Sequence, residues 1–140
     1  MFAAGLIQDY FLRLDKRIYP ASGLVAKAKI RGIPLEPADF VRLTKEVYDR
    51  IFDAFEDYDP DLVEAFESSD NVRITFSSGT VFVINRQRPL SQLWLATKKQ
   101  GLHFNYDPDQ DLWVADKTGE EFFKVLAREI TQTLGQPFNF

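Results

Sequence analysis

Apolar residues recur at steps of three and four along one stretch near the middle of the chain, and this spacing predicts an amphipathic helix. The helix spans about 38–58, with a buried stripe that runs from Phe40 to Tyr58. Pro37 lies just before the helix, where its missing N–H costs nothing. Pro60 ends it.

A second stretch with the same spacing predicts a helix over about 120–134. Glu120 and Glu121 suit the positive end of the helix dipole in its first turn. Gly135 is placed to end the helix, because glycine readily adopts the left-handed conformation found there.

Between the helices, apolar and polar residues alternate in short runs, which is typical of half-buried strands. Turn residues separate the runs, and their close spacing favours an antiparallel meander. The order is helix, about six strands, helix. The simplest way to cover such a sheet is to pack both helices on one face, so we predict this α+β fold, an α-β sandwich. The runs are 62–66, 72–76, 80–84, 92–96, 102–106 and 112–114.

The start of the chain differs in character. Residues 2–18 have helical spacing with basic residues at one end, and 19–37 contain repeated Pro and Gly. We therefore expect an N-terminal extension and linker over 1–37 and a domain over 38–140. A remnant of a targeting segment, a capping helix and an extension without a role all remain open for this region.

The absence of Cys and the single His limit the kinds of metal site and catalysis that this chain can support. The 140 residues include no Cys and one His, His103. This excludes disulfides, thiolate metal sites and a Cys nucleophile, and it argues against a buried zinc site. No apolar run approaches the roughly 20 residues that a membrane helix needs. One domain of ordinary size is expected.

Charge is distributed unevenly. The net charge is −4, but 36–70 hold twelve Asp/Glu against three Lys/Arg, whereas 1–35 hold six Lys/Arg and two Asp. A field of this kind attracts cations and basic protein surfaces and repels nucleic acid.

Most of this acidity falls at steps of three and four, opposite the apolar stripe of the first helix, and continues into the first strand. Lys45 and Arg50 are the only basic residues near enough to offset the repulsion. Carboxylates are hard oxygen ligands suited to iron, manganese or calcium, and without His or Cys their affinity should be weak. A plain solvated helix face is the alternative. The candidate metal ligands are Glu46, Asp49, Asp53, Glu56, Asp57, Asp59, Asp61 and Glu64.

The two tryptophans receive different predictions. In an alternating strand Trp94 faces away from Leu93 and Leu95, so it faces solvent if those two pack under the helices. An exposed Trp beside Asn and Gln has the composition of an interface hot spot. Trp113 is predicted to lie in the core.

The segment 84–98, INRQRPLSQLWLATK, closely resembles the central signature of the frataxin family, an Asn-x-Gln and a Trp seven residues past the Gln. Residues 101–104 (GLHF), Trp113 and 116–120 (DKTGE) also match, in order. The resemblance covers 38–140 and is nearest to the bacterial branch.

The resemblance implies an iron-binding accessory protein of iron–sulfur cluster assembly, which docks on a cysteine desulfurase and a scaffold protein and regulates the desulfurase rather than acting as an enzyme. It implies iron, Fe²⁺ or Fe³⁺, bound weakly at the surface, and no organic cofactor. Among the acidic residues, the resemblance assigns iron binding most directly to Asp53, Glu56, Asp57 and Asp59. The implied partner-binding residues are Asn85, Arg86, Gln87, Trp94 and His103.

Arg86 is expected to supply positive charge beside the tryptophan. We expect a monomer, with iron-dependent oligomerisation left open, in the bacterial cytoplasm or alternatively the mitochondrial matrix. A ferroxidase or iron store and an iron-independent interaction module are the alternative functions.

Overall fold

The computed structural model describes residues 35–140. Two helices and six strands follow one another in the order α2 (Pro37–Phe55), β1 (Val63–Ser68), β2 (Asn71–Phe76), β3 (Val81–Gln87), β4 (Gln92–Ala96), β5 (Gly101–Asp107), β6 (Leu112–Ala115) and α3 (Phe122–Leu134). A 3-10 turn, η2 (Arg88–Leu90), joins β3 to β4. The predicted N-terminal extension lies outside the described residues, apart from 35–37.

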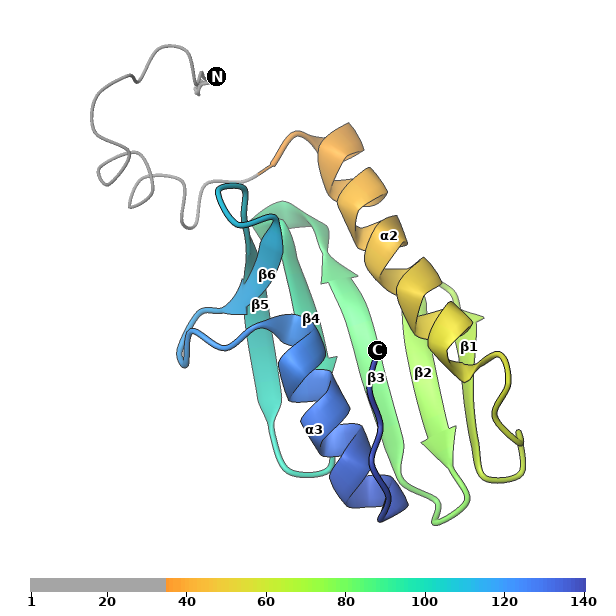
Figure 1. Ribbon diagram of the computed structural model, residues 1–140. Helices are drawn as coiled ribbons and strands as arrows, with labels where there is room; N and C mark the ends of the chain where they lie inside the picture. The colour runs from red at the N-terminus through yellow and green to blue at the C-terminus, as the bar shows by residue number, and fades with distance from the viewer. Residues whose placement is uncertain (1–34) are drawn as a thin grey trace. The chain divides into compact units, whose positions relative to one another are not determined.

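The six strands form one antiparallel sheet in which every strand pairs with its neighbour in sequence. Both helices lie on the same face of this sheet, α2 near β1 and α3 near β6 (Figure 1). Within residues 35–140, no helix lies on the opposite face. This arrangement confirms the predicted α+β fold. No helix within 35–140 is long and apolar enough to cross a membrane.

The core lies between the sheet and the helices because the alternation of each strand places most of its large apolar residues on that side. Buried and half-buried positions alternate throughout β2, in β3 as far as Ile84 and in β4 as far as Leu95. Phe82, Ile84 and Leu93 are completely buried. Trp113 is 5% exposed and meets the ring of Phe40 edge-on at 6.1 Å between centroids, so its predicted core position is confirmed.

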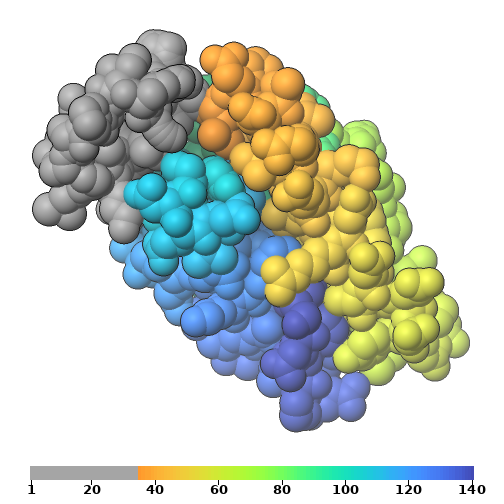
Figure 2. Space-filling model, turned by 45° about the horizontal axis from the view of Figure 1, so that its top comes forward, coloured from red at the N-terminus to blue at the C-terminus, as the bar shows by residue number. Residues whose placement is uncertain are grey.

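The C-terminal tail closes the gap between the two helices. Figure 2 shows the last residues, in dark blue, between α3 and the yellow end of α2. Phe138 stacks on Phe55 of α2 at 5.0 Å between centroids, and Phe140 meets Phe123 of α3 at 4.8 Å. The tail therefore links two helices that are distant in sequence.

Several boundaries differ from the sequence prediction, and three of them matter for the surfaces described below. The first helix ends at Phe55, because the N–H of Glu56 bonds to the oxygen of Asp53 three residues back and the chain then turns. The second helix begins at Phe122, because the Glu121 side chain caps it by accepting two backbone N–H groups. Strand β3 runs to Gln87, three residues beyond the predicted end.

Candidate functional site

The acidic strip, defined as the eight predicted metal ligands, is exposed along its whole length. Its helical members lie on the side of α2 opposite the buried stripe, as the spacing predicts. Asp59 and Asp61 follow in the turn after the helix, where the Asp61 N–H donates to Oδ1 of Asp59 at 2.9 Å. The Asp59 carboxylate therefore also shapes this turn.

Glu64 departs from the strip. It pairs with Thr75 across β1 and β2, on the side opposite the buried partners Val63 and Phe76. Its side chain therefore lies on the face of the sheet that carries no helix. The expectation that Glu64 continues one ridge with the helix is wrong, because the strand alternation turns it around the sheet edge. The acidic surface passes over β1 from one face to the other.

Only the first two members of the strip, Glu46 and Asp49, are neutralised within residues 35–140. Lys45 Nζ lies 2.6 Å from Asp49 Oδ2, and the hydrogen bond and charge of Asp49 raise the pKa of Lys45. Arg42 also pairs with the strip, 3.6 Å from Glu46, although only Lys45 and Arg50 were predicted to offset it. The other six carboxylates form no ion pair within the described residues.

Arg50 does not offset the strip, contrary to the sequence prediction. Its guanidinium carbon lies 4.1 Å above the ring centre of Phe123 on α3, a cation–π contact between the two helices. Because Arg50 turns toward α3, Asp53 on α2 and Asp57 just after it are left without a basic partner within residues 35–140.

The unpaired carboxylates also stand at the unfavourable end of the helix dipole. The last turn of α2 contains no basic residue, while Asp53, Glu56 and Asp57 crowd its C-terminal end. Anions there meet the negative pole, which costs about 0.3–1 kcal/mol each, and i,i+4 repulsion adds about 0.2–0.5 kcal/mol per pair. A cation or a basic protein surface would reduce both the unfavourable interaction with the helix dipole and the repulsion between the carboxylates.

Neutralising the crowded end should therefore stabilise the protein. We expect Asp53→Asn, Glu56→Gln and Asp57→Asn together to raise the free energy of unfolding by about 1 kcal/mol at low salt. Urea denaturation followed by circular dichroism measures this change, and most of the gain should vanish in 1 M salt, where screening removes the repulsion. Asp109→Asn, in the β5–β6 turn, is the control. A lowered stability of the triple variant would contradict the repulsion argument.

No group of three or more Asp, Glu or His within 35–140 is close enough to hold one metal ion. The strip presents carboxylates singly and in pairs along its length. Such an arrangement favours a diffuse cation layer or shared ligation with a partner over one tight site, because each cation would meet at most two protein carboxylates.

The second surface is the face of the sheet that carries no helix. The middle strands β3 and β4 place seven side chains on it, and none of them is charged. Depletion of charge around a central aromatic residue is the composition found at the core of protein interfaces. The seven are Val81, Val83, Asn85, Gln87, Gln92, Trp94 and Ala96.

Trp94 lies at the centre of this sheet face, half-buried. Its ring stacks on His103 of β5 at 4.0 Å between centroids and 12° between planes. The indole N–H donates to Gln92 at 2.9 Å, and Gln92 in turn donates to Asn105 at 3.2 Å. These contacts hold the ring in one orientation, so little side-chain entropy is lost when a partner covers it.

Asn85 and His103 flank Trp94 in one cross-strand row, since Asn85 pairs with Trp94 and Trp94 with His103. His103 also lies 4.0 Å from Asp116. Four of the five predicted partner-binding residues thus share one face. Gln92 and Asn105 were not predicted, although the same strand alternation would have placed them beside Trp94.

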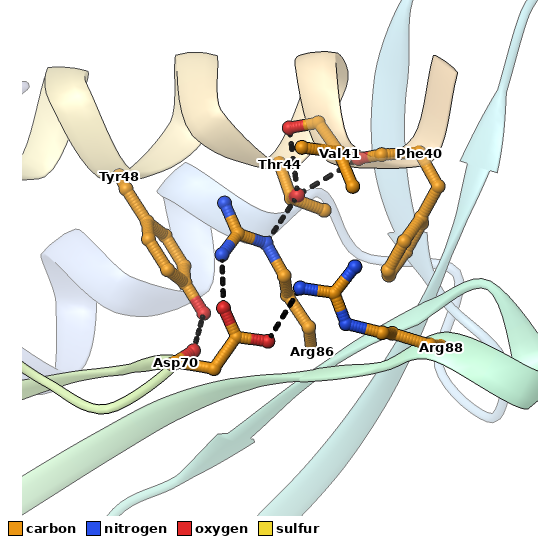
Figure 3. A network of polar contacts seen from close by, with 7 residues as sticks. All are labelled: Phe40, Val41, Thr44, Tyr48, Asp70, Arg86 and Arg88. Carbon is orange, nitrogen blue, oxygen red and sulfur yellow. Dashed lines mark hydrogen bonds and ion pairs between the residues drawn. The ribbon is translucent and has the colours of Figure 1, made fainter. Parts of the chain in front are cut away.

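Arg86 is the exception. Its side chain is 8% exposed and lies on the helix side of the sheet, so the expectation that it supplies charge beside Trp94 is wrong. Figure 3 shows its guanidinium between Thr44 and Tyr48 of α2 and Asp70 of the β1–β2 turn. Because β3 extends past Ile84, Arg86 follows Phe82 and Ile84 on the core side.

The Arg86 network joins three elements. Arg86 Nε donates to Thr44 Oγ1 at 2.6 Å and its guanidinium carbon lies 4.4 Å from the Tyr48 ring centre. Asp70 also accepts from Arg88 at 3.0 Å. Partial burial raises the pKa of Asp70, but the hydrogen bonds and charges of the two arginines outweigh it and hold that pKa below its usual value. Burial raises the pKa of Tyr48 to about 12.

A groove of about 450 Å³ lies between α2 and the β5–β6 turn. Its charged groups are already engaged with one another: Arg42 contacts Asp39 and Glu46. Tyr106 donates to Asp111, and burial followed by that carboxylate raises the pKa of Tyr106. The groove therefore offers few free polar groups to a ligand. Its lining comprises Leu35, Asp39, Arg42, Leu43, Glu46, Tyr106, Pro108 and Asp111.

The fold and its two surfaces describe a small α+β sandwich with an acidic helix and an uncharged, Trp-centred sheet face. A family model described as a frataxin-like domain matches residues 33–136. The chain belongs to the frataxin family.

The relatives agree with this assignment. The chain is 36% identical over 106 residues to the iron-sulfur cluster assembly protein CyaY of Pseudomonas fluorescens, covering 76% of this chain and 96% of that protein. Frataxin from Psychromonas ingrahamii superposes with a TM-score of 0.68 at 28% identity, over 75% of this chain and 97% of that one.

Trimeric frataxin from the yeast Saccharomyces cerevisiae, with its full-length N-terminus, superposes with a TM-score of 0.56 at 22% identity, over 84% of this chain and 98% of that one. A second structure of the trimeric yeast protein, complexed with ferrous iron, gives a TM-score of 0.51 at 20% identity over 78% and 98%. At these identities the yeast structures establish the shared fold alone.

Proposed function

We propose that this protein is an iron-binding accessory protein of iron–sulfur cluster assembly that docks on a cysteine desulfurase and its scaffold protein. The acidic strip meets a basic patch on the desulfurase, and the uncharged sheet face around Trp94 meets the assembled complex. The CyaY relative, named for iron–sulfur cluster assembly and matched over nearly its whole length, supports this role.

One observation carries the proposal. Asp53, Glu56 and Asp57 crowd the negative end of a helix and have no ion-pair partner within residues 35–140. This arrangement lowers the stability of the isolated protein. It becomes favourable when a basic surface or a cation neutralises it, so the strip is suited to binding rather than to folding.

Iron is the cation that this proposal assigns to the strip. Its exposed carboxylates are hard oxygen donors, and no nitrogen or sulfur ligand stands among them. With at most two carboxylates per ion, binding is weak and replaceable. Iron held in this way can pass to an acceptor, because few bonds must break for it to leave.

Charge reversal at the crowded end tests the docking. We expect Asp53→Lys with Asp57→Lys to weaken binding to the desulfurase of the same organism by about a hundredfold or more at low salt, since each of the two lost charge pairs couples by about 1.5 kcal/mol or more, roughly a factor of ten in affinity. Biolayer interferometry measures the affinity. The loss should fall mainly on the association rate and shrink as salt rises.

The matched control is Glu36→Lys with Asp109→Lys, which changes the net charge equally but lies outside the strip. Equal losses in both variants would show that only total charge matters. Unchanged binding of the strip variant would overturn the proposal that the acidic strip docks on the desulfurase.

The iron assignment is tested separately by anaerobic Fe(II) titration of the labelled protein. Amide signals of residues 46–64 should broaden in the unmodified protein and stay sharp in the charge-reversed variant. Fast stoichiometric oxidation on adding oxygen would instead indicate a ferroxidase. Full desulfurase binding without the carboxylates, but not after Trp94→Ala, would indicate an iron-independent interaction module.

A further inference from the structure

One exposed aromatic residue lies outside both surfaces described so far. Among residues 35–140, the exposed large apolar side chains are Val41, Phe66 and Leu90, and Phe66 is the aromatic one, 39% exposed. Phe66 belongs to the edge strand β1 and pairs with Arg73 on the face that carries no helix. A single exposed apolar residue is ordinary, so its surroundings decide whether it matters.

Phe66 stands where the acidic strip passes into the sheet face. Glu64, the last member of the strip, lies two residues earlier on the same face of β1. On the other side, the cross-strand row continues through Arg73 to Val83 of the uncharged centre. The phenyl ring is therefore between the two surfaces that the proposed function assigns to docking.

The strand spacing and the size of a typical interface together imply that a partner contacting both surfaces also covers Phe66. Strands lie about 4.8 Å apart, so β1 is roughly 14 Å from β4, which carries Trp94. A standard interface buries about 800 Å² on each partner, a patch roughly 30 Å across. A protein that contacts Asp57 and Trp94 together would cover Phe66 as well.

We propose that Phe66 is an aromatic anchor of this docking surface and inserts into an apolar pocket with a basic rim on the desulfurase. This inference rests on the proposed function. Charge decides the occupant: Glu64 lies two residues from Phe66 on the same face of β1, the rest of the strip follows around the edge of the sheet, and Glu64 forms no ion pair within the described residues. A second copy of this chain would bring 19 acidic and 11 basic residues over 35–140, a net −8, toward the same carboxylates.

The anchor and the strip contribute differently to binding, which separates their tests. Charges at a rim act mainly on the association rate, whereas a buried aromatic anchor acts mainly on the dissociation rate. We expect Phe66→Thr to weaken binding to the desulfurase about tenfold or more, chiefly through faster dissociation and with little change in salt dependence. Threonine is chosen because it suits an edge strand.

Two further variants keep this test decisive. Val41→Thr removes an exposed apolar side chain from α2 and should change the affinity less than twofold. Phe66→Leu retains an apolar side chain and should recover part of the affinity lost in Phe66→Thr. The thermal midpoint of each variant is measured alongside, so that a loss of folded protein is not read as a loss of binding.

A loss below twofold for Phe66→Thr, with the charge-reversed strip variant still impaired, would overturn the anchor and leave the proposed function intact. If the strip variant also binds normally, the proposed function itself fails. A concentration-dependent dimer of the unmodified protein in sedimentation velocity, abolished by Phe66→Thr, would assign the ring to self-association and overturn the desulfurase as its occupant.

Discussion

Replacing Phe138 by alanine is expected to lower the free energy of unfolding by about 3–4 kcal/mol. The side chain is 4% exposed and meets the rings of Phe55, Tyr58 and Phe140. Truncating a buried Phe removes its apolar burial and leaves a cavity, at a cost of about 3–5 kcal/mol. The lower end applies here because a terminal segment can partly collapse into the space.

Urea denaturation measures this loss, and for a domain near 100 residues the thermal midpoint should fall by roughly 12 °C or more. Asn139→Ala, the exposed neighbour in the same tail, is the control and should change little. A loss below 1 kcal/mol for Phe138→Ala would mean that the tail does not hold the two helices together in solution.

The second large effect is expected at Asp70. Arg86 is the more deeply buried partner of the pair, so Asp70→Ala leaves a buried guanidinium without its carboxylate and should cost about 3 kcal/mol. Arg86→Met removes the buried charge itself and leaves a half-exposed Asp70, which Arg88 still contacts. We expect this variant to cost about 1–2 kcal/mol.

Combining Asp70→Ala with Arg86→Met completes a double-mutant cycle, and its coupling energy measures the interaction between the two side chains. It should be about as stable as Arg86→Met alone, because neither charge remains unpaired. Equal single losses that simply add in the double variant would contradict the unequal burial of the two groups.

The same pair predicts a pH dependence with a defined sign. The folded-state pKa of Asp70 lies below its ordinary value of 3.8 because Arg86 and Arg88 stabilise the carboxylate. Its contribution is therefore fully present above about pH 4 and is lost as the pH falls through the folded pKa, when the carboxylate takes up a proton. The coupling energy measured at pH 6 should accordingly disappear in strong acid, while the loss caused by Phe138→Ala should persist wherever the domain remains folded.

Local patterns were sufficient for much of the fold. Periods of three to four and of two identified both helices and all six strands, because each element must bury one side against the same core. Turn residues separated the strands closely enough to require antiparallel neighbours. The acidic strip on α2 could also be read directly, since helical spacing alone places residues three and four apart on one side.

The sequence by itself determined which residues alternate and which share a helical face, and it placed Trp94 outward because its neighbours Leu93 and Leu95 are apolar. Only the tertiary structure decided where charges find partners. Arg50 turns to Phe123, which is distant in sequence, and Arg86 meets Thr44 and Asp70 because β3 continues past Ile84. Glu64 leaves the helix side for the opposite face. These outcomes depend on strand length, register and the approach of separate elements, which short-range spacing does not encode.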